Sequence, residues 1–287
     1  NGWSRRARVS PPGASCWRPA ACAGQKGGIW ISWDAEEAGT FHVFARALPA
    51  PARPGRVHRL TNGPDLHLDS AVAEGQDGGV WVAWSRLEHW NTSRIYRLNA
   101  HRDLVLRRLD PKTGRISVCD SGEEAAGGQV ARPPDPFPGG NATCPQLYVD
   151  DKGAVHLLFR CIHIIGDRTK GAYSWGWSVE ELVRSGPEWA GPRRLSAGKG
   201  FSMRPASVAQ PDGRLHVACQ ECDPDPASSD GRPPNALPRA VVYRIEPLRG
   251  RTPAEAPYDW TVPAAPSERV RRPRPKANEN GRQLVWG

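Results

Sequence analysis

The chain lacks any apolar run of about 18 residues, the length that a helix needs to cross a bilayer, so no membrane-spanning helix is expected. It has one methionine and five phenylalanines against twelve tryptophans, so packing between elements is expected to depend on indoles. The C-x-x-C of Cys219 and Cys222 has no second pair that would complete a zinc site. We therefore predict no metal or cofactor in the chain, and we interpret its seven cysteines as small buried residues with room for one disulfide.

Positive charge is not gathered on one face in the way that nucleic-acid binding requires. The formal net charge is +9, and residues 263–287 supply six basic side chains, four prolines and only two glutamates. A nucleic-acid interface combines a concentrated basic surface with aromatic residues. Neither nucleic acid nor a membrane is therefore an expected partner, and residues 263–287 are predicted to form an extended linker.

What the chain does have is a repeat. Segments that begin near Arg18, Asp69, Cys144 and Arg204 align without gaps through a shared glycine, at Gly27, Gly78, Gly153 and Gly213. Each glycine follows a short apolar segment and precedes a second one that is rich in Val, Ile and Trp, which is the pattern of a β-hairpin. Self-similarity with units of about 50 residues is typical of propellers and solenoids.

Two further strand-like segments follow each hairpin, as at 41–47 and 56–61 after 18–24 and 28–34. Four antiparallel strands a unit predict an all-β propeller with four recognisable blades over residues 1–262. The chain opens within what aligns as the last strand of a preceding blade, so we expect the propeller to be incomplete at the amino end and the chain to be a fragment or a processed product.

The binding face is expected where the variable connections meet. Connections between the second and third strands of each unit are predicted at 34–40, 85–103, 160–171 and 220–239, and variable loops on one face of a repeat protein usually bind its ligand. Indole, carboxylate and imidazole groups around a propeller mouth suit a sugar. The binding candidates are Trp17, Arg18, His67, Asp69, His89, Trp90, His163, Arg204 and Glu221, of which Asp69 and Glu221 are also the catalytic candidates.

The blade pattern resembles the neuraminidase-type (BNR) propeller repeats. The pattern leads from a "W…P…LS" segment into RPASVAQPDGRLHVA at 204–218. Asp151–His156 is similar to the Asp-box core, with His in place of Trp. Gln25 and Gln76 stand where that motif has Asp. The resemblance implies a sialidase-like site with three arginines, a Tyr–Glu pair and an acid. Arg18 and Arg204 match two arginines, although equivalent positions in a repeat also suit a structural role. No third aligned arginine and no Tyr–Glu pair is identifiable.

The carboxyl end carries a second resemblance. Gly281–Gly287, read GRQLVWG, is similar to the junction at which a BNR-like propeller precedes a metal-dependent domain of the PHP type in a large bacterial family. That resemblance implies a downstream domain as a partner, with a divalent metal held there, and we favour an extracellular or periplasmic location.

These features predict a non-catalytic propeller that binds glycan or docks onto a downstream hydrolase domain. Two alternatives remain: a sialidase-like glycoside hydrolase or polysaccharide lyase with its site on the loop face, and a protein-interaction platform. Two carboxylates about 5 or 9 Å apart at the mouth would favour hydrolysis.

Overall fold

The computed structural model describes residues 8–49, 54–87, 102–118, 142–167, 172–186, 188–196, 201–209, 215–222 and 239–245. This part of the chain is entirely β. The strands are β1 (Ser15–Ala23), β2 (Ile29–Glu37), β3 (Thr40–Leu48), β4 (Val57–Arg59), β5 (Leu66–Glu74), β6 (Val80–Leu87), β7 (Arg102–Leu109), β8 (Ile116–Val118), β9 (Ala142–Val149), β10 (Val155–Asp167), β11 (Ala172–Ser185), β12 (Glu188–Arg194), β13 (Phe201–Ala209), β14 (Leu215–Cys222) and β15 (Arg239–Ile245).

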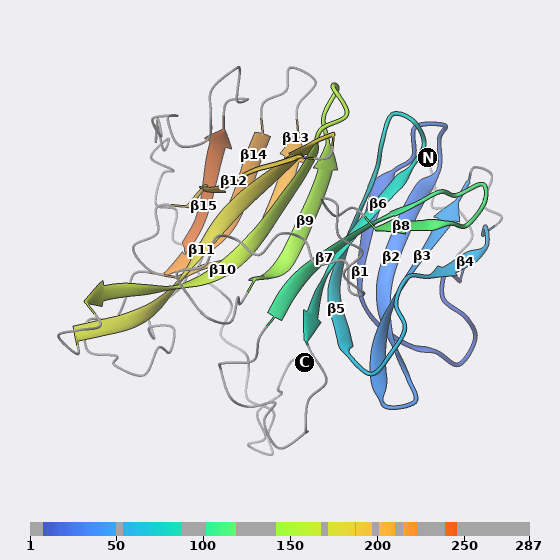
Figure 1. Ribbon diagram of the computed structural model, residues 1–287, viewed down its shortest axis with the longest axis horizontal. Helices are drawn as coiled ribbons and strands as arrows, with labels where there is room; N and C mark the ends of the chain where they lie inside the picture. The colour runs from blue at the N-terminus through green and yellow to red at the C-terminus, as the bar shows by residue number, and fades with distance from the viewer. Residues whose placement is uncertain are drawn as a thin grey trace, which may run out of the picture.

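The strands are grouped in blades, as the repeat predicts. Strands β1–β4 and β5–β8 form two four-stranded sheets, and β9–β15 form a third, larger sheet (Figure 1). Within that third sheet, β9–β12 and β13–β15 are each antiparallel, and a single parallel pairing of Trp177 with Phe201 joins the two groups. The expected β-propeller of four-stranded antiparallel blades is confirmed, with β13–β15 as the described strands of the fourth blade. The fourth strand of the fourth blade and the linker predicted at 263–287 lie outside the described residues.

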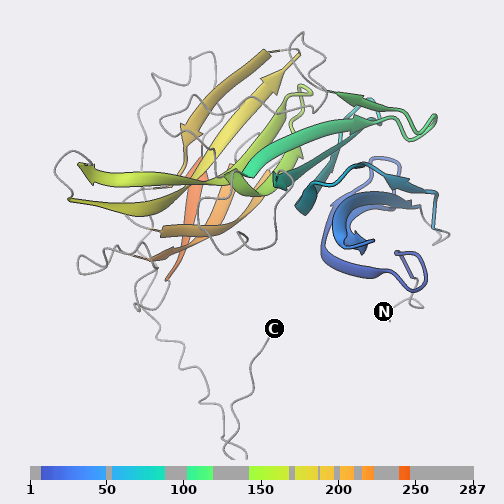
Figure 2. The same cartoon turned by 60° about the horizontal axis from the view of Figure 1, so that its bottom comes forward.

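Two of the predicted loops are largely strand. In the first blade the connection expected at 34–40 is a two-residue turn, Ala38–Gly39, and both residues have positive φ, as a tight hairpin with the right twist requires. In the third blade β10 and β11 pair continuously out to Asp167 and Ala172, so the loop expected at 160–171 is mostly a long ribbon (Figures 1 and 2). The residues that pair along this ribbon include isoleucines on β10 and aromatic residues on β11, and both residue classes favour strands.

Three of the four apolar clusters lie between blades, and the fourth, around Trp33 and Phe44, belongs to the first blade. Trp30 of the first blade packs in one cluster with Val72, Val82 and Trp84 of the second. A second cluster joins the second and third blades, and a third joins the third and fourth. Trp30, Trp81 and Trp84 are all under 9% exposed, so the expected packing by indoles is confirmed in the described part of the chain.

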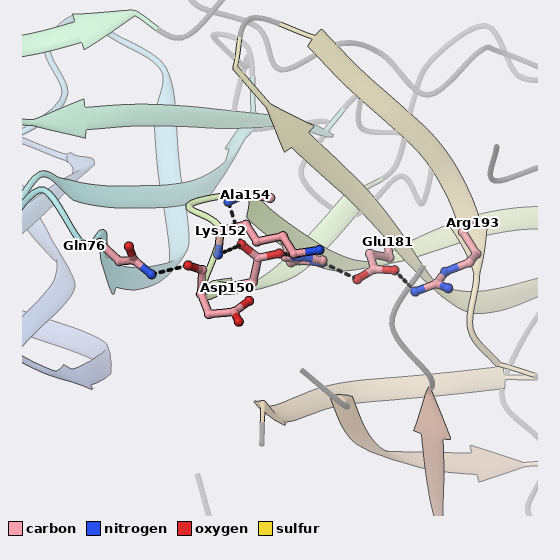
Figure 3. Close-up of polar contacts among 8 residues, drawn as sticks. Gln76, Asp150, Lys152, Ala154, Glu181 and Arg193 are labelled. Atoms are coloured by element: carbon pink, nitrogen blue, oxygen red, sulfur yellow. Dashed lines mark hydrogen bonds and ion pairs between the residues drawn. The ribbon is translucent and has the colours of Figure 1, made fainter. Parts of the chain in front are cut away.

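On one side of the molecule, the innermost hairpins also link neighbouring blades through polar contacts. The backbone N–H of Gln25 donates to a carboxylate oxygen of Glu74 at 2.9 Å, which ties the first blade to the second. The side chain of Gln76 donates to the backbone carbonyl of Asp151, which ties the second blade to the third (Figure 3). Gln25 and Gln76 occupy equivalent positions in the repeat, and each contributes a hydrogen bond between adjacent blades.

Each innermost strand is interrupted by a bulge at the same repeat position. Two residues of β1, Arg18 and Pro19, lie opposite the single residue Trp33 of β2, and the register shifts at the equivalent place in the other three blades. At the first bulge residue of blades one to three, φ is 46° at Arg18, 57° at Asp69 and 55° at Cys144. This left-handed conformation costs a residue with a Cβ about 1–2 kcal/mol. Bulges are frequent next to functional sites because they redirect a side chain.

Cys144 offers the cleanest test of this strain, because no described ion pair depends on its side chain. We expect Cys144→Gly to raise the free energy of unfolding by about 1 kcal/mol, since glycine adopts positive φ freely. Cys144→Val should lower it by more than 1 kcal/mol, since β-branched residues tolerate this conformation worst. Urea denaturation of the two variants measures both effects.

The control is Ala71→Gly, at a strand position with no positive φ, where added backbone freedom should destabilise by about 1 kcal/mol. Equal destabilisation by glycine at positions 144 and 71 would contradict the strained bulge.

Candidate functional site

The first two blades bring four polar and aromatic side chains together at the bulge. We call Trp17, Arg18, Asp34 and Asp69 the mouth cluster; they come from β1, β2 and β5. Trp17 is the cross-strand neighbour of Asp34, and Arg18 and Asp69 occupy equivalent bulge positions in adjacent blades. Three of the four were sequence candidates; Arg18 and Asp69 form an ion pair, and Trp17 lies beside them through its pairing with Asp34.

Arg18 binds both carboxylates of the cluster. Its Nε and Nη2 donate to Asp34 Oδ2 at 3.1 and 2.9 Å, and its Nη1 donates to Asp69 Oδ1 at 3.0 Å. Three of the five guanidinium N–H groups are therefore occupied, which leaves two for other acceptors. The Arg18 side chain is 42% exposed and that of Asp69 is 20% exposed, so both remain accessible to a ligand.

Asp34 is the buried member of the cluster. Its side chain has no solvent exposure, and its Oδ1 has no hydrogen-bond partner among the described residues. Burial raises the pKa of Asp34 above its usual value because a low-dielectric environment disfavours the charge, and the two bonds from Arg18 only partly offset this. Asp34 therefore holds a proton more readily than an ordinary aspartate.

Trp17 supplies an apolar surface beside these charges. It is 55% exposed, whereas Trp30, Trp33, Trp81 and Trp84 are each buried in a strand core. β1 is mostly exposed along its length and β5 is mostly buried, so the first blade presents its innermost strand to solvent in the described part of the chain. An exposed indole on such a strand is available for stacking against a planar or apolar ligand face.

Sequence reasoning missed Asp34, although a signal existed. The repeat aligns Asp34 with Ser85, Arg160 and Gln220, each directly after the aligned residues Trp33, Trp84, Phe159 and Cys219. A position that is equivalent in the fold but different in chemistry from blade to blade is not serving the repeat. Polar variation at this position, next to the bulge, is the pattern that could have identified it.

The remaining candidates lie elsewhere. His67 is buried in β5, where its Nδ1 accepts a hydrogen bond from Trp84 Nε1 at 2.9 Å. Burial lowers its pKa to about 4, so the ring is a neutral core group near neutral pH. Glu221 lies in β14, and its Oε1 accepts from Ser202 at 3.2 Å in the fourth blade. Glu221 was expected in the connection at 220–239, and the structure places both residues in strands.

His163 and Arg204 are also strand residues. His163, expected in the third loop, lies in the long ribbon of β10 opposite Gly176, and Arg204 lies at the bulge of β13. His89 and Trp90 lie outside the described residues.

A row of four side chains crosses the third blade, one from each of its strands: Tyr148, His156, Glu181 and Arg193. His156 stacks on Tyr148 with ring centroids 4.1 Å apart and contacts Glu181 Oε1 through Nδ1 at 2.8 Å. Glu181 also pairs with Arg193 (Figure 3). Burial alone would raise the pKa of Glu181, but the hydrogen bond from His156 and the charge of Arg193 together lower it. Tyr148 and Glu181 thus lie in one network that sequence reasoning missed, and the Glu181 side chain has no solvent exposure, so the network has a packing role.

The described cysteines are free thiols, and Cys16 is exposed although the cysteines were expected to be buried. Cys219 of the C-x-x-C is a free thiol, and burial raises its pKa to about 12, which makes it a small apolar core residue. Among the residues that the structure describes, no three His, Cys, Asp or Glu side chains are grouped as metal ligands, and no helix is long and apolar enough to span a membrane.

No protein-family model and no curated protein matches the chain. Solved structures resemble it in fold. A Hadza microbial sialidase superimposes with a TM-score of 0.53 at 10% identity, over 83% of this chain and 47% of the sialidase. An endo-arabinase from Bacteroides thetaiotaomicron gives a TM-score of 0.48 at 14% identity, over 82% of this chain and 76% of that chain. A thermostable family-43 glycoside hydrolase gives a TM-score of 0.49 at 13% identity, over 84% of this chain and 77% of that chain.

This likeness shows a sialidase-like propeller fold and nothing finer, since fold alone does not determine function. The chain spans about half of the sialidase's length.

The buried neutral His67 predicts a dependence of stability on pH. Its pKa is about 4 in the folded protein and 6.5 when unperturbed, so the unfolded state binds more protons between these values. The contribution of neutral His67 to the free energy of unfolding is therefore fully present above pH 6.5, and it is lost as the pH falls toward 4. At 1.36 kcal/mol for each pKa unit, the loss from this group is about 3 kcal/mol.

His67→Gln keeps an acceptor for Trp84 and cannot titrate. Urea denaturation at pH 7 and pH 4 should show a loss of stability that is about 3 kcal/mol smaller in the variant than in the natural chain. An equal loss of unfolding free energy between pH 7 and pH 4 in both proteins would show that the pKa of His67 is not lowered by folding.

Proposed function

We propose that this chain is a glycan-binding β-propeller module that performs no catalysis of its own, with its ligand held at the mouth cluster. The observation that carries the proposal is the exposed indole of Trp17 next to the Arg18–Asp34–Asp69 group. A pyranose or furanose ring offers one apolar face and a rim of hydroxyls. Stacking on indole and hydrogen bonds to fixed polar groups satisfy both.

The geometry provides both kinds of contact. Arg18 retains two N–H groups that can donate to hydroxyl or ring oxygens, and the partly exposed carboxylate of Asp69 can accept from hydroxyls. The left-handed backbone of Arg18 and Asp69 adds a second line of support, because strain of this kind concentrates at binding and catalytic sites. The sialidase-like fold agrees with a sugar ligand by analogy only.

A catalytic alternative exists because the cluster also holds two carboxyl groups with different environments. Asp34 has a raised pKa, as a general acid requires. A general acid must also reach the leaving oxygen of the substrate, and Asp34 is fully buried against Arg18. Each carboxylate is already paired with the same guanidinium, so we favour binding over hydrolysis. The BNR relationship and docking onto a following metal-dependent domain remain predictions that no described residue tests.

Trp17→Ala should weaken glycan binding about tenfold, which corresponds to about 1.4 kcal/mol, because the stacking surface is lost. Affinity electrophoresis against a panel of polysaccharides identifies a ligand, and calorimetry with its oligosaccharides measures the change. Trp17→Phe should retain part of the affinity. The control is Ile29→Ala, which removes another exposed apolar side chain, 40% exposed, from a different strand. Equal binding by Trp17→Ala and the natural chain would place the ligand elsewhere.

The purified chain should not hydrolyse aryl sialosides or other aryl glycosides above background, since neither carboxyl of the mouth cluster is free to act. The measurement is release of the chromogenic aglycone over a range of pH. Robust turnover that Asp69→Asn or Glu221→Gln abolishes would establish a hydrolase in place of a binding module.

A further inference from the structure

We infer that the mouth cluster selects uncharged glycans and disfavours those that carry carboxylates. This inference rests on the proposed function and names the ligand class of the same site. It concerns the charge that a ligand meets at Arg18, the arginine that the likeness to sialidases would have assigned to a sugar carboxylate.

The charge of Arg18 is already compensated within the protein. A carboxylate ligand is best held by an arginine whose N–H groups are free to donate as a pair. In this chain the Nε and Nη2 groups of Arg18 both donate to Asp34 Oδ2, and Nη1 donates to Asp69 Oδ1. An incoming carboxylate would be the third acidic group around one guanidinium, and it would meet Asp69 as a like charge at short range.

Of the two aspartates, only Asp69 can turn away from Arg18 toward solvent. Asp34 is fully buried, and two hydrogen bonds hold it to Arg18, so it cannot turn toward solvent without unfolding its surroundings. Asp69 is 20% exposed and makes the single outer bond to Nη1. Asp69 is therefore the residue that sets the charge seen by the ligand.

Uncharged sugars meet no such conflict. Their hydroxyls can accept from the two unoccupied N–H groups of Arg18 and donate to Asp69, and their apolar faces can stack on Trp17, which is 55% exposed. Other charged groups near the innermost strands do not reverse this preference. Arg160 donates to Thr143 at 2.9 Å and lies 4.0 Å over the ring of Trp177, and Glu221 adds an acidic group in the fourth blade.

The test compares the natural chain with Asp69→Asn. Asparagine has the same shape as aspartate and tolerates positive φ, so the variant removes the charge while it keeps the bulge. The probes are oligosaccharides of neutral xylan and galactan and of acidic polygalacturonate and hyaluronan, measured by affinity electrophoresis and calorimetry at low and at physiological salt. Asp151→Asn is the matched control, because Asp151 is an exposed carboxylate in the turn after β9, at the opposite end of the strands.

We expect the natural chain to bind a neutral probe at least tenfold more tightly than any acidic one. Asp69→Asn should lower the ratio of neutral-probe to acidic-probe affinity about tenfold, and the change should be larger at low salt. Asp151→Asn should leave this ratio unchanged.

The failures are distinguishable. If the natural chain prefers an acidic glycan, for example through Arg204, the selectivity inference is overturned and the glycan-binding function stands. The inference also fails if Asp69→Asn and Asp151→Asn give the same ratio of affinities. If the natural chain binds no probe of either class, the proposed function fails, and the inference fails with it.

Discussion

The burial of each blade's apolar face against the next blade is the constraint on which the rest of the structure depends. The clusters around Trp84 and Phe159 contain residues from two blades each, so most of a blade's apolar surface is buried only by its neighbour. Stability is therefore a property of neighbouring pairs of blades. Hydrogen bonds of Gln25 and Gln76 join the first three blades near the hairpins, and the Arg18–Asp69 ion pair joins the first two at the bulge. A residue of the mouth cluster can therefore also stabilise the contact between two blades. A variant at such a residue needs a measurement of stability as well as a measurement of binding.

The bulge connects this architecture to the mouth. Four innermost strands accommodate an extra residue opposite Trp33, Trp84, Phe159 and Cys219, and at three of these places a residue with a Cβ adopts positive φ. Glycine would relieve that strain at every one of them, yet the chain places arginine, aspartate and cysteine there. The cost is about 1–2 kcal/mol at each position. At Arg18 and Asp69 the ion pair between blades offsets part of it, and the redirected side chains form the mouth cluster.

Much of the fold could be predicted from the sequence, because a β-hairpin is local. The shared glycine and the alternating apolar residues around it locate β1, β2, β5 and β6 within a few residues. The length of the β10–β11 ribbon could not be predicted, because strand pairing beyond a blade's edge depends on two segments that match each other only in space. The same reason hid the row of Tyr148, His156, Glu181 and Arg193, whose members come from four strands. Glu221 was placed in a loop because a polar residue near a repeat boundary resembles a loop residue, and the burial of His67 against Trp84 is a tertiary property.

The mouth shows how a repeat acquires a specific site. Residues that recur in every blade, such as the hairpin glycines, satisfy requirements that every blade shares, and they carry no information about a ligand. The bulge position holds Arg18, Asp69, Cys144 and Arg204, and the position after the aligned core residue holds Asp34, Ser85, Arg160 and Gln220. The same interruption of the innermost strand therefore presents a different side chain in each blade. Where two adjacent blades present Arg18 and Asp69, the two side chains pair with each other, and the buried Asp34 accepts two further hydrogen bonds from Arg18. The same pairing that joins the blades also compensates the positive charge of Arg18, and the proposed preference for uncharged ligands is a consequence of this pairing.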